Sequence, residues 1–100
     1  MKLGSYKHTT VEKKRYTISY AEWLEDGETL SSVTYAITPT TTTPLLIEGS
    51  ALAGDGLGVS LFISGGEDEE EYQINVLAQT DAGQRKEDYI KIVMDNYDVA

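Results

Sequence analysis

The segment 65–94 constrains the fold most, because apolar and polar residues alternate on both sides of a short polar turn. The alternating apolar residues are Tyr72, Ile74, Val76 and Ala78 before the turn at 80–84, and Ile90, Ile92 and Met94 after it. A period of two on both sides of a glycine-containing turn predicts a half-buried antiparallel hairpin. We therefore expect a protein built on β-sheet.

One register of this hairpin sorts its side chains by polarity. With the turn centred on Ala82, Tyr72 lies opposite Ile92 and Ile74 lies opposite Ile90 on one face. The other face then pairs Gln73 with Lys91, Asn75 with Tyr89, and Leu77 with Glu87. A slip of one residue would reverse this sorting, so we expect the register to be well determined.

Three apolar residues, Leu77, Tyr89 and Val93, lie on the otherwise polar face of the predicted hairpin. Isolated apolar side chains are normal on protein surfaces, and these could pack across the strands or under a loop. The alternative is a patch that faces a partner protein.

Further segments rich in β-forming residues predict strands at 15–20, 30–38, 45–48 and 59–64. Turns or loops with Gly, Pro and Thr separate them, at 25–28, 39–44 and 49–58. A tyrosine that begins the penultimate strand is typical of immunoglobulin-like sandwiches. We therefore predict an all-β fold, a single immunoglobulin/fibronectin-III-like antiparallel β-sandwich of about seven strands over residues 15–100. The predicted core is Ile18, Tyr20, Val33, Tyr35, Ile37, Leu45, Ile47, Val59, Leu61, Ile63, Tyr72, Ile74, Val76, Ile90, Ile92 and Met94.

Charge divides the chain unevenly. Residues 1–15 carry a net charge of +4, and residues 16–100 carry −13. We expect residues 1–14 to form a flexible basic N-terminal arm, which either stays solvated or lies on the acidic body of the next copy. The acidic body disfavours nucleic-acid binding, since it would repel phosphate. No apolar run approaches the roughly 20 residues that span a membrane, and the N-terminus lacks the apolar segment of a secretory signal.

Catalytic and metal-binding patterns are weak in this sequence. The chain has no Cys, and its one histidine, His8, falls in the expected arm, where we expect it to be exposed. The acidic run 67–71 lacks the spaced pattern of a calcium loop and is interpreted as a solvated turn. No nucleophile and base can be paired, so we expect no enzyme activity, no cofactor and no metal site.

Residues for partner binding can nevertheless be proposed. The basic residues of the expected arm and its junction are one group, and aromatic and apolar residues outside the expected core are another. Trp23 is interpreted first as a core plug, with a binding hot spot as the alternative and glycan stacking as a third option. The candidates are Lys7, Lys13, Lys14, Arg15, Trp23, Phe62, Leu77 and Tyr89.

Two blocks of this chain resemble a family of tailed-bacteriophage virion proteins that are described as fiber–tail adaptors. The first block is an aromatic-rich strand at 16–20, then Trp23-Leu24 and the turn Asp26-Gly27-Glu28-Thr29. The second is an apolar strand ending in Ser64-Gly65-Gly66, then Tyr72 and the turn 80–85. The blocks span residues 16–94, and Phe62 stands where the family pattern has Trp.

The resemblance implies a multicopy structural protein of the virion, assembled in the bacterial host cytoplasm. Its partners would be other virion proteins of the tail, neck or fibers, and it would form a homo-oligomeric ring through a head-to-tail interface. A capsid decoration protein and a sugar- or receptor-binding module are the alternatives. The resemblance implies no catalytic residues.

Overall fold

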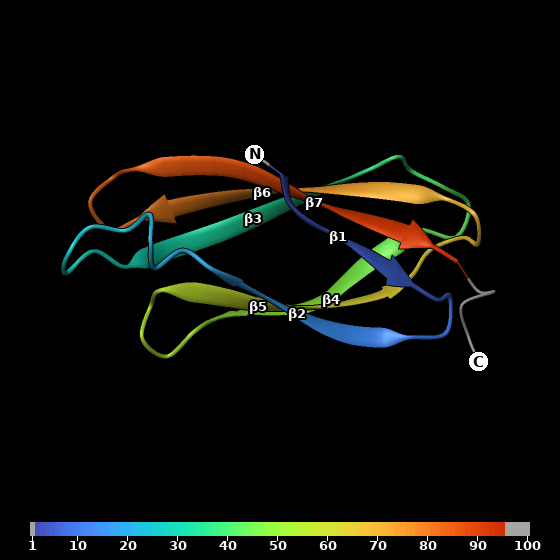
Figure 1. The fold of residues 1–100 in the computed structure, drawn as a ribbon, viewed down its shortest axis with the longest axis horizontal. Helices are drawn as coiled ribbons and strands as arrows, with labels where there is room; N and C mark the ends of the chain where they lie inside the picture. The colour runs from blue at the N-terminus through green and yellow to red at the C-terminus, as the bar shows by residue number, and fades with distance from the viewer. Residues whose placement is uncertain (1, 96–100) are drawn as a thin grey trace.

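Seven strands form two sheets that pack face to face in the computed structural model, which describes residues 2–95 (Figure 1). The strands are β1 (Lys2–His8), β2 (Lys13–Ser19), β3 (Leu30–Thr38), β4 (Leu45–Leu52), β5 (Gly58–Gly65), β6 (Glu71–Thr80) and β7 (Arg85–Met94). One sheet has the order β1-β7-β6-β3 and the other the order β2-β5-β4. The predicted all-β sandwich is confirmed.

The order of the strands differs from a constant-type immunoglobulin sandwich at the first strand. There the first strand joins the sheet of the second, fourth and fifth strands. Here β1 joins the other sheet and pairs with β7 in parallel, whereas the other pairs are antiparallel. The chain therefore begins its fold beside its last strand.

The strand β1 lies where the sequence predicts a flexible arm over 1–14. Residues 2–8 instead belong to the sandwich, and a turn at 9–12 leads into β2. The side chains of β1 alternate weakly because Gly4 interrupts the pattern. A parallel edge strand is held by backbone hydrogen bonds to β7, which leave little trace in the local sequence.

The predicted register of the last hairpin is confirmed. Tyr72 pairs with Ile92 and Ile74 with Ile90. The other face pairs Gln73 with Lys91, Asn75 with Tyr89 and Leu77 with Glu87, as expected. The four β6 residues on the inner face, Tyr72, Ile74, Val76 and Ala78, are fully buried.

Most of the predicted core is buried between the two sheets. Val33, Tyr35, Ile37 and Ile47 are instead only partly buried, although they pack against the core. They lie on β3 and β4, each of which is an edge strand with a neighbour on one side only. Tyr16, Leu30 and Ala78 join the core in addition.

Tyr72 closes the corner between β5 and β6. Its ring is buried, and its hydroxyl accepts a hydrogen bond from the Glu67 N–H at 3.0 Å. The same hydroxyl lies 2.7 Å from Oγ1 of Thr41 in the β3–β4 loop. This arrangement is similar to the tyrosine corner that occurs in immunoglobulin-type sandwiches, and it joins two loops at one end of the molecule.

We expect Tyr72→Phe to lower the free energy of unfolding by about 1–3 kcal/mol, because it removes the acceptor of the partly buried Glu67 N–H and one of the two partners of the Thr41 hydroxyl. Urea unfolding followed by tryptophan fluorescence measures this change. Tyr89→Phe, on the outer face of β7, is the control and should cost less than about 0.5 kcal/mol. Equal stabilities of the two variants would contradict a structural role for the Tyr72 hydroxyl.

Candidate partner-binding surfaces

The outer face of the three-stranded sheet carries exposed apolar side chains. Leu61 and Ile63 point into the core, so Phe62 between them points outward and is 39% exposed. Leu46 on β4 pairs with Ser64 and lies diagonally across from Phe62, with 47% exposure. Side chains at such diagonal positions reach one another on one face of a sheet. Phe62 and Leu46 therefore form one apolar surface, here called the Phe62 face.

Basic side chains border the Phe62 face on β2. The Nζ atom of Lys13 lies 5.6 Å from the centre of the Phe62 ring, a cation–π distance. Arg15 is exposed and pairs directly with Phe62 across the two strands. The register of β2 with β5 thus brings together three of the residues predicted from the sequence.

Leu77 and Tyr89 lie on the outer face of the other sheet and are half-buried. Tyr89 pairs with Asn75, which places Leu77 diagonally across from it. Their mutual proximity fits the interpretation that they pack across the strands. This pair therefore offers a smaller apolar surface than the Phe62 face does.

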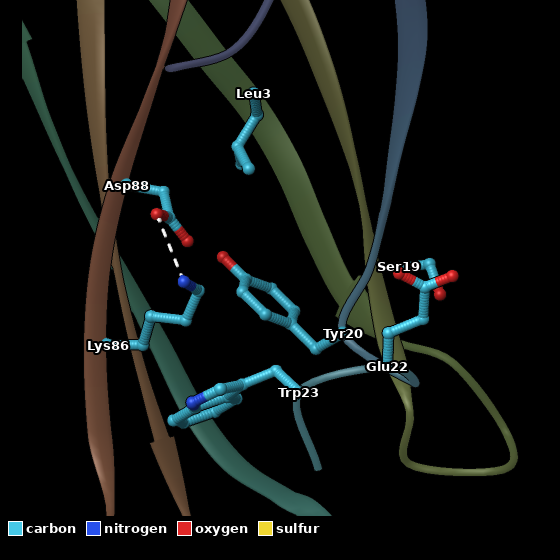
Figure 2. A pocket seen from close by; sticks show the side chains of 7 residues that line it. All are labelled: Leu3, Ser19, Tyr20, Glu22, Trp23, Lys86 and Asp88. Atoms are coloured by element: carbon cyan, nitrogen blue, oxygen red, sulfur yellow. Dashed lines mark ion pairs between the residues drawn. The ribbon is translucent and has the colours of Figure 1, made fainter. Parts of the chain in front are cut away.

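Trp23 lines a pocket of about 500 Å³ between the β2–β3 connection and the first residues of β7 (Figure 2). The ring is partly buried against the core and lies edge-on to Tyr20, with 6.0 Å between the ring centres. Lys86 lies over the Trp23 ring at 6.0 Å. The core interpretation of Trp23 is thus largely correct, although one side of the ring faces the pocket.

A carboxylate lies inside this pocket. Asp88 is 2% exposed, and its Oδ1 atom lies 3.5 Å from the Lys86 Nζ atom. The Tyr20 hydroxyl points toward this pair in Figure 2. Burial, with a smaller contribution from Asp88, raises the pKa of Tyr20 to about 12, so this phenol stays protonated at neutral pH.

The remaining basic candidates meet at the turn between β1 and β2, at the end of the sandwich opposite the β2–β3 connection (Figure 1). Lys7 and Lys14 line one pocket of about 440 Å³ there with Val11, which is 88% exposed. The Nζ atom of Lys14 lies over the Tyr16 ring at 5.7 Å. The eight predicted residues thus occupy four separate places rather than one site.

His8 was expected to be exposed, but it is buried beneath this turn. Parallel pairing of β1 with β7 places His8 beside Met94, on the inner face of the sheet. Tyr16 O–H lies 3.3 Å from its Nδ1 atom, and the Glu12 carbonyl lies 3.2 Å from its Nε2 atom. A neutral ring with its proton on Nε2 donates to the carbonyl and accepts from the phenol. Burial lowers the pKa of His8 below 6.5.

Because the folded chain resists protonation of His8, the unfolded chain takes up this proton first as the pH falls below about 6.5. The contribution of His8 to stability is therefore complete above pH 6.5 and is lost toward its lower folded pKa. We expect this single proton to lower the free energy of unfolding by at most about 1.4 kcal/mol for each unit that the pH falls. Urea unfolding between pH 7.5 and 5 should show a steeper loss for the wild type than for His8→Gln, and parallel curves would contradict this.

The turn residues of the two sequence blocks have a structural role. Glu28 is buried, receives a hydrogen bond from the Thr80 hydroxyl at 2.7 Å and accepts another from the Glu25 N–H at 3.1 Å. Thr29 and Asp81 exchange hydrogen bonds of 3.0 and 3.1 Å between the same two turns. The turn 26–29 of the first block thus docks on the turn 80–85 of the second.

Sequence reasoning missed Leu46, although the alternation of Leu45 and Ile47 into the core was enough to predict that the Leu46 side chain points outward.

Within residues 2–95, no cluster of three His, Cys, Asp or Glu side chains could hold a metal ion. The same residues contain no helix that is long and apolar enough to cross a membrane.

One family model matches residues 9–93, and its description is podophage GP4 fiber-tail adaptor protein gp77. No curated protein matches the sequence. A solved structure, the 2,6-sialyltransferase of Vibrionaceae Photobacterium sp. JT-ISH-224 with CMP and lactose, is similar with 13% identity and a TM-score of 0.51. The match covers 95% of this chain and 18% of that chain. At such low identity the likeness concerns the β-sandwich fold alone.

Proposed function

This chain belongs to the podophage fiber-tail adaptor family, and on that premise we propose that it is a non-enzymatic virion protein that docks fibers or other components at the tail. The family match over residues 9–93 is the observation that carries the proposal. It fits a sandwich in which the turn residues of the two sequence blocks dock on one another.

The Phe62 face is the surface that best suits docking. It combines an exposed aromatic ring and an exposed leucine with Lys13 and Arg15 at its border. Aromatic and arginine side chains dominate the energy of protein interfaces because they bury much area and pair with charged groups. A tail or fiber protein with an apolar patch beside carboxylates would complement it.

We also propose that copies of the chain associate in a ring. The exposed basic residues Lys7 and Lys14 share the β1–β2 end with the acidic run 67–71, whose Glu69 N–H donates to the Met94 carbonyl beside His8, so the two ends of the sandwich do not carry opposite charges. A head-to-tail contact between copies closes into a ring when the rotation between them allows it. Assembly in the host cytoplasm suits a chain without Cys, because that compartment keeps thiols reduced.

The proposal is tested with phage particles that lack this chain. Particles assembled without it should keep their heads but lose fibers, and the wild-type chain supplied in trans should restore them. Negative-stain electron microscopy counts the fibers on each particle. Fully fibered particles without the chain would contradict the adaptor role.

A further inference from the structure

The free edge of β3 is built differently from the other edges of the two sheets. The edge strands are β1 and β3 in one sheet and β2 and β4 in the other. β1 contains two lysines, β2 contains two lysines and an arginine, and β4 contains Glu48 at an irregularity in its pairing. β3 is nine residues long and has no charged side chain.

Charges and bulges on edge strands prevent unwanted pairing with other chains. Beyond an irregularity at its start, β3 pairs regularly with β6 from Ser32 to Thr38, so this part of its edge is unprotected. Within residues 2–95, no backbone hydrogen bond from 31–38 reaches beyond the β6 ladder. The edge therefore presents unpaired backbone groups to an incoming strand.

The inner side chains of β3 are also incompletely covered. Val33, Tyr35 and Ile37 are partly buried, while their partners on β6 are fully buried. Tyr35 reaches across to β4, where its hydroxyl lies 2.6 Å from Ser50 Oγ. A strand added beside β3 would therefore satisfy backbone groups and cover apolar side chains at once.

We propose that the β3 edge pairs with the β3 edge of a second copy, in an antiparallel and two-fold symmetric contact that joins two four-stranded sheets into one. When Tyr35 lies opposite Tyr35 of the second copy, Val33 lies opposite Ile37 and Thr34 opposite Ala36. Inner residues then meet inner residues, and outer residues meet outer ones. Aromatic and β-branched pairs across strands are favourable, and the contact contains no like charges.

This contact goes beyond the proposed adaptor function and uses different residues. β3 lies at the opposite edge of its sheet from β1, so the basic β1–β2 end stays available. The Phe62 face belongs to the other sheet. A paired assembly could therefore still bind tail or fiber proteins, and pairing can be tested on the isolated chain.

The test compares Thr34→Lys with Thr17→Lys by sedimentation equilibrium of the full chain. Both threonines are exposed on edge strands, and both substitutions change the net charge equally. In the paired sheet, the lysine side chains that Thr34→Lys introduces in the two copies would be diagonal neighbours and would repel each other. We expect Thr34→Lys to raise the dimer Kd at least about tenfold and Thr17→Lys to leave it unchanged.

Hydrogen exchange provides a second measurement. Alternate amides within 32–38 should exchange more slowly in concentrated than in dilute wild-type solution, and this difference should vanish in Thr34→Lys. A wild-type chain that is monomeric at about 100 µM, or a dimer that survives Thr34→Lys, would overturn self-pairing. A third outcome also overturns self-pairing: the chain is monomeric in solution, yet Thr34→Lys reduces its incorporation into particles. That result would indicate that β3 pairs with a strand of another virion protein instead.

Discussion

Gly65→Ala should lower the free energy of unfolding by about 3 kcal/mol, since the position excludes a side chain for two reasons. Its backbone has a φ of 74°, which is unfavourable for any residue with a Cβ atom. In addition, a Cβ atom would lie 2.7 Å from the Pro44 carbonyl oxygen, which accepts a hydrogen bond from the Gly66 N–H. The main chain would have to move where β5 leaves β4.

Gly27→Ala separates the two contributions. Gly27 has a similar φ of 81°, but a Cβ atom there would meet nothing within 4 Å. The free energy of unfolding of this variant should fall by only about 1–2 kcal/mol, which is the cost of placing a residue with a Cβ atom at a positive φ. Urea unfolding of both variants gives the difference, and a Gly65→Ala variant no less stable than Gly27→Ala would contradict the steric account of the Ser-Gly-Gly segment.

The double substitution Phe62→Ser and Leu46→Ser should reduce incorporation of the chain into particles about 30-fold, which corresponds to the loss of one interface hot spot of about 2 kcal/mol. Both side chains are exposed, so the fold should tolerate the change. The variant competes with the wild-type chain during assembly in cells. Quantitative mass spectrometry of purified particles then gives the ratio of the two.

Val11→Ser is the matched control, because Val11 is 88% exposed and lies on the β1–β2 turn, away from the Phe62 face. It should enter particles as the wild type does. Thermal melting of each variant excludes unfolding as the cause of any loss. If the double variant enters particles as well as Val11→Ser does, the Phe62 face is not the docking surface.

The part of the fold predicted correctly depends on local patterns. Alternation and turn chemistry predicted the last hairpin, including the pairing of Ile74 with Ile90. β1 was missed because its position depends on a parallel contact with β7, at the far end of the chain. The burial of His8 follows from that contact, so it could not be inferred from the surrounding residues.

The candidate site was predicted residue by residue but not as an arrangement. Exposure of Phe62 follows from alternation, whereas its contact with Lys13 requires the register of β2 with β5. The half-buried state of Val33 and Ile37 likewise depends on β3 being an edge strand, which the local sequence does not determine. Nonlocal pairing thus sets the composition of each surface.

The most direct measurement of the central claim is immunogold electron microscopy of intact particles of the phage that encodes this chain, with an antibody against the recombinant domain. The adaptor account predicts gold at the tail or at the fiber base. Gold distributed over the head would contradict it and would instead indicate a capsid decoration protein.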